Sequence, residues 1–366
     1  MIIDSHIHYS LPRTCEEVLE ALEMTGCEYG NLVAQLSKTR ASETLDCLCA
    51  KYLSKGKLYT YGSLDVTEYY KMNELGKKQA EHVEKLMACG CDGIKMLEGK
   101  PEERKKFPIP DFDSPEFDAY FEYMEKNRIP IVWHINDPEE FWDINKVPEW
   151  ALRSGWFYDD SFVNNEKQYT QVENVLKKHP NLVVTFAHFY FLSAQLDRLG
   201  EMFDKYPNVC VDMAPGIELF ENLSKNIEVS RKFFEKYQDR IIYGTDICRL
   251  EETPDNDFNL KDTIIRGKLC QEFIVKDKVY IPGDEKSLLG KDDLNLNGLN
   301  LPKEIADKIF YKNFLRITGK PKEINVDEVL KEIEREKDRV KFLSSFNNEK
   351  CNLSYLETIE NIFKTK

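Results

Sequence analysis

Five residues whose side chains can bind a metal each stand at or just beyond the end of a short apolar segment. They are His6, His8, His134, His188 and Asp246. Residues 1–8 form one such segment, and alternation along a strand puts His6 and His8 on the same face. Imidazole nitrogens with one carboxylate suit Zn²⁺ and also accept Mn²⁺, Fe²⁺ or Co²⁺. The chemistry to expect from such a set is metal-assisted, provided that the fold brings the five together.

Apolar and amphipathic segments alternate along the chain, which is the pattern of a parallel α/β fold. Eight segments are expected to be strands, at residues 1–8, 29–36, 57–66, 93–97, 129–134, 182–187, 209–213 and 240–246. The count favours a closed (β/α)₈ TIM barrel over a doubly wound open sheet. The open sheet is further disfavoured because residues 5–9 contain no glycine for a dinucleotide-binding loop.

The expected barrel spans residues 1–319, and a helical extension follows at 320–366, with helices at 326–343 and 353–364. Residues 98–114 are expected to be a loop because prolines interrupt them. Two longer segments, 135–166 and 258–300, are expected as inserted loops, the second with a hairpin near 279–287. The extension packs on the barrel or on a partner subunit, which would make the protein a homodimer.

The composition is that of an ordinary globular protein, with 42% hydrophobic and 32% charged residues. A net charge of -14 argues against a nucleic-acid surface and against a basic membrane patch. The chain has no apolar run long enough to span a membrane and opens directly on a strand, so we expect a cytoplasmic protein. The ten cysteines lack the spacings of a zinc site and are expected to be free thiols.

In a barrel, the carboxyl ends of the strands meet on one face, so the five residues would converge there. One such histidine is more often a buried structural residue than a ligand, but four of six at strand ends, with an aspartate beside the first strand, favour a site. A bound metal would activate water at neutral pH, and Asp246 would accept the proton. His188 could hydrogen-bond the nucleophile or the developing oxyanion.

With these motifs the sequence resembles the amidohydrolase superfamily, in particular the branch called amidohydrolase family 2. The matching stretches are Ile3-Asp4-Ser5-His6-Ile7-His8, Val132-Trp133-His134, Phe186-Ala187-His188, Tyr243-Gly244-Thr245-Asp246 and residues 309–316. The resemblance implies a metal-dependent barrel with His6, His8, His134 and Asp246 as ligands and His188 as a catalytic residue or auxiliary ligand. It also implies divided chemistry, since that branch holds hydrolases, decarboxylases and hydratases.

Three features of this chain bear on that resemblance. Where relatives often have glycines after the histidine at 188, this chain has Phe189-Tyr190-Phe191, and Ile247-Cys248-Arg249 follows Asp246 in place of a common Tyr-Pro pair. Lys95 could be carboxylated and bridge two metals, as in some binuclear relatives. We favour one ion because His134 and the branch motifs indicate a single-metal site, and Lys95 is then a substrate or structural group.

Three cationic side chains follow strand ends on the expected metal face: Arg13, Lys95 and Arg249. Together they could bind a substrate carboxylate or phosphate, although each could equally pair with a nearby acid. Trp142 and Trp156 in the aromatic loop could wall the pocket.

The sequence therefore predicts a metal-dependent hydrolase of a small, anionic substrate, with zinc as the favoured ion. The alternatives are a decarboxylase or hydratase on the same metal site and, as a different class, a barrel without catalytic activity.

Overall fold

The computed structural model describes residues 1–216, 218–247, 256–283 and 293–365, without the side chains of residues 150 and 256–261. Its main sheet has eight parallel strands, in the order in which they follow along the chain: β1 Ile3–Ile7, β2 Tyr29–Val33, β5 Leu58–Ser63, β6 Gly93–Gly99, β7 Ile131–Ile135, β8 Val184–Phe186, β9 Val209–Asp212 and β10 Ile241–Ile242. Each of the eight predicted strands is therefore present.

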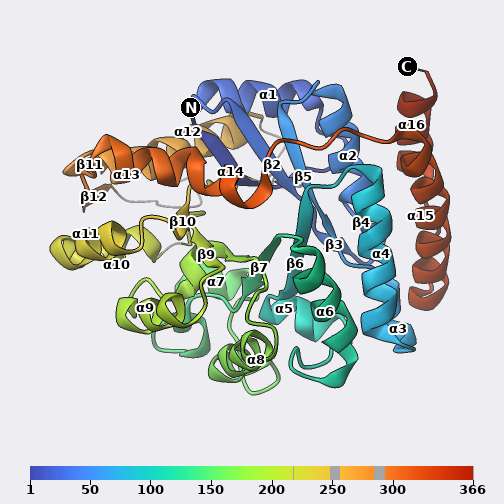
Figure 1. Cartoon of the computed structure of the whole chain (residues 1–366), viewed down its shortest axis with the longest axis horizontal. Helices are drawn as coiled ribbons and strands as arrows, with labels where there is room; N and C mark the ends of the chain where they lie inside the picture. The colour runs from blue at the N-terminus through green and yellow to red at the C-terminus, as the bar shows by residue number, and fades with distance from the viewer. Residues whose placement is uncertain (217, 248–255, 284–292, 366) are drawn as a thin grey trace.

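Backbone contacts beyond the ends of β10 join it to β1 and close the sheet. Ser5 N donates to Tyr243 O at 3.1 Å, Asp246 N donates to His6 O at 2.9 Å, and His8 N donates to Ile247 O at 2.8 Å. Figure 1 shows the strands at the centre with helices around them. The predicted (β/α)₈ barrel is confirmed, and the open sheet is excluded.

Helices follow most strands and cover the outside of the barrel. They are α1 Cys15–Met24, α2 Thr44–Leu53, α3 Val66–Lys71, α4 Leu75–Cys89, α5 Pro101–Lys106, α6 Asp118–Asn127, α8 Asn165–Lys178, α9 Leu196–Lys205, α10 Leu219–Lys225, α11 Ile227–Lys236 and α12 Asn256–Val275. The first begins where the sequence indicates, because Thr14 and Glu17 form a reciprocal capping box. Val18 and Leu22 then lie on its buried face.

Three expected loops contain helices. Residues 98–114 include α5, because Pro101 stands at the first helical turn, where a proline begins a helix rather than breaking it. Residues 135–166 contain a 3₁₀ turn at Glu139–Trp142 and the short helix α7 Glu149–Arg153. Residues 258–300 are not an inserted loop throughout, since α12 occupies much of that range, and the hairpin of β11 Lys278–Ile281 and β12 Leu294–Asn297 follows it.

The barrel interior is filled by side chains. One buried cluster combines Ile3, Tyr59, Cys210 and Ile242 of four strands with Phe314 of α14 Asn313–Thr318. A second combines Val33, Tyr61, Val132 and Ala187. These layers leave the carboxyl ends of the strands as the face available for a site.

The chain after the barrel forms the long helix α15 Val326–Asn347 and the helix α16 Ser354–Lys364, which lie beside α2, α3 and α4 (Figure 1). Arg339 of α15 is bound by three carboxylates, those of Asp65, Glu332 and Glu336, at 2.6 to 2.8 Å. In this chain, the extension therefore packs on the barrel itself.

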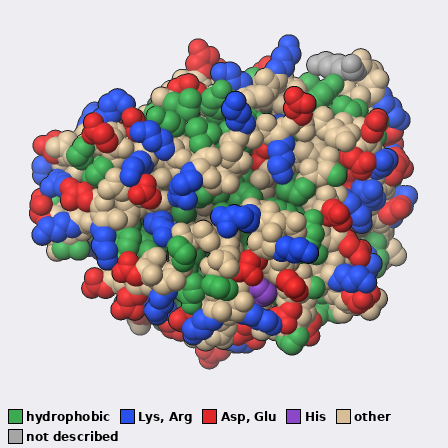
Figure 2. Space-filling view, in the orientation of Figure 1, with side chains coloured by type: hydrophobic (Ala, Val, Ile, Leu, Met, Phe, Trp, Pro, Cys, Tyr) green, Lys and Arg blue, Asp and Glu red, His purple; other side chains and the backbone are tan. Residues whose placement is uncertain are grey.

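The surface view shows acidic and basic side chains interspersed with apolar ones (Figure 2). None of the helices in the described ranges is long and apolar enough to cross a membrane. All nine cysteines that the structure describes are free thiols, and eight of them are buried.

His82 of α4 is buried against α15, and its contribution to the free energy of unfolding can be tested. Burial, followed by the Arg339 guanidinium, lowers the pKa of His82 to about 4. The unfolded chain takes up a proton near its ordinary value of 6.5, whereas the folded chain does not. The native state should thus lose about 1 to 3 kcal/mol as pH falls through this window.

We predict that His82→Gln removes this contribution. Urea unfolding of both proteins at pH values between about 7 and 4.5 would show the wild type losing stability more steeply than the variant. Parallel pH profiles would contradict the assignment, because every other titrating group is shared by the two proteins.

Candidate metal centre

The sequence-predicted cluster is assembled at the carboxyl ends of β1, β7, β8 and β10. One group of side chains that could hold a metal ion lies in the described part of the chain, in which His6, His188 and Asp246 each offer a ligand atom within 4.8 Å of the others. His8 adjoins it, since its Nε2 is 3.1 Å from Asp246 Oδ1. His6 Nε2 is 3.6 Å from the same oxygen. Three imidazoles and a carboxylate therefore face one small volume.

His134 lies beside this group in a different orientation. Its ring centroid is 4.8 Å from that of His188. Its Nε2, however, donates to Asn136 O at 2.8 Å and is 3.4 Å from Asp137 Oδ1. Only Nδ1 of His134 is then left for an ion. Among the described residues, the group within 4.8 Å contains His188 and not the expected ligand His134.

The other ring nitrogens are fixed by groups outside the cluster. His6 Nδ1 donates to the buried carboxylate of Asp212 at 2.8 Å, and His188 Nδ1 lies 3.2 Å from Ala214 O. His8 Nδ1 lies 3.1 Å from Val33 O. A proton held on Nδ1 leaves the Nε2 lone pair free, which is the form in which an imidazole binds a metal.

Electrostatics favour the same protonation states. Burial lowers the pKa of His6 and of His188 well below the ordinary value, so both rings are neutral near pH 7. Burial would raise the pKa of Asp246, but the hydrogen bond with His8 and the nearby imidazoles hold it well below its usual range. Neutral imidazoles and an ionised carboxylate are the donor set that a divalent ion requires.

The backbone is strained at two of the site residues, His188 and Asp246. His188, Phe189, Tyr190 and Phe191 all have φ between 52° and 59°, and Asp246 has φ of 55°. This left-handed region costs a residue with a side chain about 1 kcal/mol or more. It is also the conformation that glycines adopt without cost, which gives a physical meaning to the glycines that relatives often have after the histidine.

Aromatic packing holds the turn in this conformation. Tyr190 stacks on Phe186 with ring centroids 4.1 Å apart, and Phe189 stacks on Phe234 at 5.7 Å. The hydroxyl of Tyr169 donates to Tyr190 O at 3.1 Å. Phe189, Tyr190 and Phe191, which stand where relatives often have glycines, thus help to hold His188 in place by packing.

Lys95 is completely buried, and its Nζ lies 3.2 Å from His6 Nε2. Burial lowers its pKa to about 8, while the carboxylates of Asp212 and Asp246 oppose that shift. Of the three predicted cations, Lys95 is the one that the structure brings into the cluster.

Arg13 lies partly exposed in the turn between β1 and α1, where its carbonyl accepts from the Tyr9 hydroxyl at 2.7 Å. Arg249 lies outside the described residues. A joint anion site made by these two residues and Lys95 stays a prediction.

The two predicted tryptophans belong to the aromatic loop after β7. Trp142 Nε1 donates to Val163 O at 3.2 Å, and Lys100 Nζ stands 4.7 Å from the centre of the Trp156 ring. Lys100 also pairs at 3.2 Å with Asp137, which accepts from the Tyr158 hydroxyl at 2.5 Å. The loop is thereby joined to the strand end that carries His134, while its role as a pocket wall stays untested.

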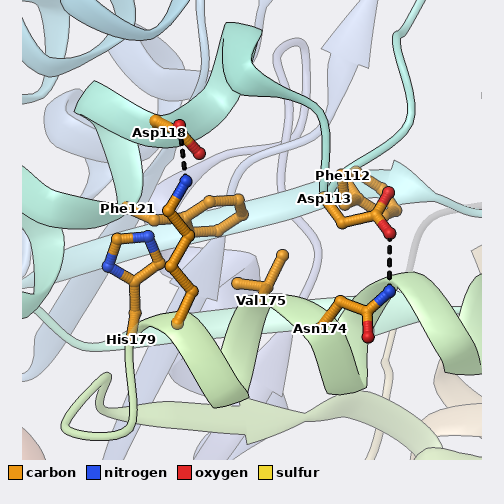
Figure 3. A pocket seen from close by; sticks show the side chains of 8 residues that line it. Phe112, Asp113, Asp118, Phe121, Asn174, Val175 and His179 are labelled. Carbon is orange, nitrogen blue, oxygen red and sulfur yellow. Dashed lines mark hydrogen bonds and ion pairs between the residues drawn. The ribbon is translucent and has the colours of Figure 1, made fainter.

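A cavity of about 200 Å³ lies elsewhere, outside the barrel wall between α6 and α8 (Figure 3). Both carboxylates that line it have partners, since Lys178 pairs with Asp118 at 2.5 Å and Asn174 donates to Asp113 at 2.8 Å. None of the predicted site residues lines it. This cavity is therefore separate from the candidate metal centre.

A closed eight-stranded barrel with imidazoles and a carboxylate at the strand ends defines a class of metal-dependent barrel enzymes. Residues 79–317 match the family described as amidohydrolase, which is more than half of the chain. The chain belongs to that family, whose members are metal-dependent enzymes that include hydrolases and decarboxylases. No curated protein matches the sequence.

Solved structures similar to this one share its fold at low sequence identity. One, described as amidohydrolase II, is 16% identical with a TM-score of 0.53 and covers 87% of this chain and 99% of its own. An uncharacterized TIM-barrel protein from Bordetella bronchiseptica is 12% identical with a TM-score of 0.53 over 86% of this chain and 97% of its own. A 2,6-dihydroxybenzoate decarboxylase in complex with 2,6-dihydroxybenzoate is 11% identical with a TM-score of 0.50 over 87% of this chain and 98% of its own.

Sequence reasoning missed Asp212, Arg266 and Asp137. Asp212 ends β9, so the strand-end rule that found the other residues could have found it as well. Arg266 is in the helix after β10, and its Nη1 lies 3.2 Å from Asp246 O and 3.4 Å from Oδ2. The spacing of residues in the sequence does not predict such a contact between Arg266 and Asp246.

We predict that Asp212→Asn weakens divalent metal binding roughly 10-fold to 100-fold, as for other groups that orient a metal ligand. The amide nitrogen would face His6 Nδ1, which must then accept, so the proton moves to Nε2, the nitrogen needed for the ion. Isothermal titration of the metal-free protein with Zn²⁺ measures the effect.

Asp92→Asn is the matched control. That carboxylate is equally buried and pairs with Lys51 at 2.6 Å, but it precedes β6, at the opposite end of the barrel. The control should lose stability while keeping wild-type affinity, and equal losses of affinity in both variants would contradict the role of Asp212.

Proposed function

We propose that this protein is a metal-dependent hydrolase of a small anionic molecule. His6, His8 and Asp246 hold one divalent ion, with His188 and His134 facing it. The supporting observation is the convergence of His6, His188 and Asp246 within 4.8 Å, with His8 3.1 Å from the carboxylate. We propose zinc, because imidazole nitrogens with one carboxylate suit it, although Mn²⁺, Fe²⁺ and Co²⁺ would be accepted.

The residues divide the remaining work. When bound, the ion acts as a Lewis acid and makes water a nucleophile near neutral pH. Asp246, which is ionised, takes up the proton of the nucleophile. His188, whose Nδ1 faces Ala214 O, presents Nε2 as an acceptor and orients that nucleophile. Of the two roles that the sequence leaves open for His188, this favours the hydrogen bond with the nucleophile, because a nitrogen without a proton cannot donate to an oxyanion.

Lys95 is the donor best placed for the negative charge of the substrate. Its ammonium is buried beside His6. A buried ammonium attracts a carboxylate more strongly than one in water does, because the protein interior screens charge less. With His6 Nε2 bound to the ion, the Lys95 ammonium would lose its contact with that nitrogen and would be available to the substrate carboxylate.

We expect His188→Asn and Asp246→Asn to fold and to lower kcat/KM roughly 10²-fold to 10⁴-fold. Asparagine is chosen because it tolerates the left-handed backbone found at both positions. Hydrolysis of small carboxylated lactones and amides is the assay, with thermal unfolding to confirm the fold. Asp143→Asn, a partly exposed carboxylate of the aromatic loop, is the control that should retain activity. Unchanged rates in either site variant would refute the site.

Isotope labelling of the solvent oxygen and detection of CO₂ distinguish hydrolysis from decarboxylation. Hydrolysis in H₂¹⁸O places ¹⁸O in the product, whereas a decarboxylase releases CO₂ from substrates such as 2,6-dihydroxybenzoate without that incorporation. Release of CO₂ in place of ¹⁸O incorporation would replace the hydrolase proposal by the decarboxylase on the same residues. Failure of the purified protein to retain or rebind any divalent metal would instead favour a non-catalytic barrel.

A further inference from the structure

Helices α15 and α16 lie outside the family match, which ends at residue 317. They pack beside a small hairpin, β3 Leu36–Ser37 with β4 Ala41–Ser42, that follows β2 on the carboxyl face of the barrel (Figure 1). The appended helices therefore contact a segment that stands close to a proposed metal ligand.

Side chains of both helices hold the hairpin at three points. Glu336 Oε1 of α15 accepts from Ser42 N at 3.2 Å and from Ser42 Oγ at 3.4 Å. Asn347 donates to Lys38 O at 3.3 Å, and the Tyr355 hydroxyl of α16 donates to Arg40 O at 2.9 Å. Glu336 is itself only 3% exposed and is fixed by Arg339.

The residue that follows the hairpin is hydrogen-bonded to Gln35, which contacts His8. Glu43, next to Ser42, accepts from Gln35 N at 3.2 Å and donates its own N–H to Gln35 O at 3.1 Å. The side-chain amide of Gln35 then lies 3.1 Å from His8 Nδ1. Hydrogen bonds, together with the peptide bond between Ser42 and Glu43, thus connect the appended helix to Gln35, whose side chain contacts the ring of His8.

A second connection reaches the turn after His8. The Arg40 guanidinium stands 4.1 Å from the centre of the Tyr355 ring and donates to Asp46 at 2.6 Å and to Leu11 O at 3.3 Å. Asp46 also accepts from Leu11 N at 3.0 Å. The loops on both sides of the His8 ring are therefore tied to α16.

We infer that the appended helix pair is a brace for the metal centre, in which Glu336 and Gln35 are positioning residues that set the orientation of His8. The inference rests on the proposed function, because it takes His8 as a ligand. It assigns to α15 and α16 a role in metal affinity in addition to any role in stability.

Co²⁺ titration of the full-length, metal-free protein, followed by its visible absorption, tests the brace. We expect Gln35→Ala to weaken Co²⁺ binding roughly 10-fold and Glu336→Ala roughly 3-fold, near or below the range for groups that touch a ligand. Both should change the absorption bands of the bound ion. Because the residues act in series, the double variant should bind little more weakly than Gln35→Ala alone.

Controls separate positioning from general stability. Lys337→Met removes the contact to Glu334 on the same helix and the contact to Glu360 on α16 without touching the hairpin, and it should leave Co²⁺ affinity unchanged. Glu336→Gln keeps an oxygen for Ser42 N–H and should restore most of the affinity. If Glu336→Ala does not fold, Glu336→Asp replaces it, since it keeps the charge near Arg339 but does not reach Ser42.

Wild-type affinity in a folded Glu336→Ala or Glu336→Asp variant would overturn the brace, and so would losses that multiply in the double variant. Absence of Co²⁺ binding by the wild type is a different result, because it overturns the proposed function and the brace with it.

Discussion

The closure of the barrel between β10 and β1 is the interaction on which the rest of the site depends. Asp246 N donates to His6 O at 2.9 Å, and His8 N donates to Ile247 O at 2.8 Å, so the backbone itself places the carboxylate beside the two imidazoles. Asp4 reinforces the junction, since its carboxylate accepts from Thr245 Oγ1 at 2.5 Å and from Thr245 N at 3.1 Å. Two residues from the start of the chain and one near position 250 thereby become neighbours.

Several residues around this junction have a backbone conformation or a buried charge that is unfavourable in a folded protein. His188 and Asp246 occupy left-handed backbone, Lys95 is buried, and Asp212 is buried against a histidine ring. Strained and charged positions of this kind persist only where the surrounding packing determines them, and they gather at functional sites. A divalent cation would bind the Asp246 carboxylate and the imidazole nitrogens beside it.

Much of the fold follows from the sequence because strands buried on both faces are continuous apolar runs, as Ile129–Trp133 shows. The strand-end rule likewise finds His6, His8, His134, His188 and Asp246. Pro101 was misleading because a proline at the first turn of a helix and a proline in a loop look alike in sequence. The orientation of His134 toward Asn136, the hydrogen bond from His6 to Asp212, and the connection from Glu336 to Gln35 depend on contacts between distant residues, which one sequence does not encode locally.

The central claim is that His6, His8 and Asp246 hold one divalent ion. Anomalous diffraction at the zinc edge from crystals of the zinc-loaded protein tests it directly. The account predicts a single peak at about 2.0 to 2.2 Å from His6 Nε2, His8 Nε2 and an Asp246 oxygen, with Lys95 Nζ no longer against His6 Nε2. A peak elsewhere, or none at this position while Lys95 keeps its contact with His6, would contradict it.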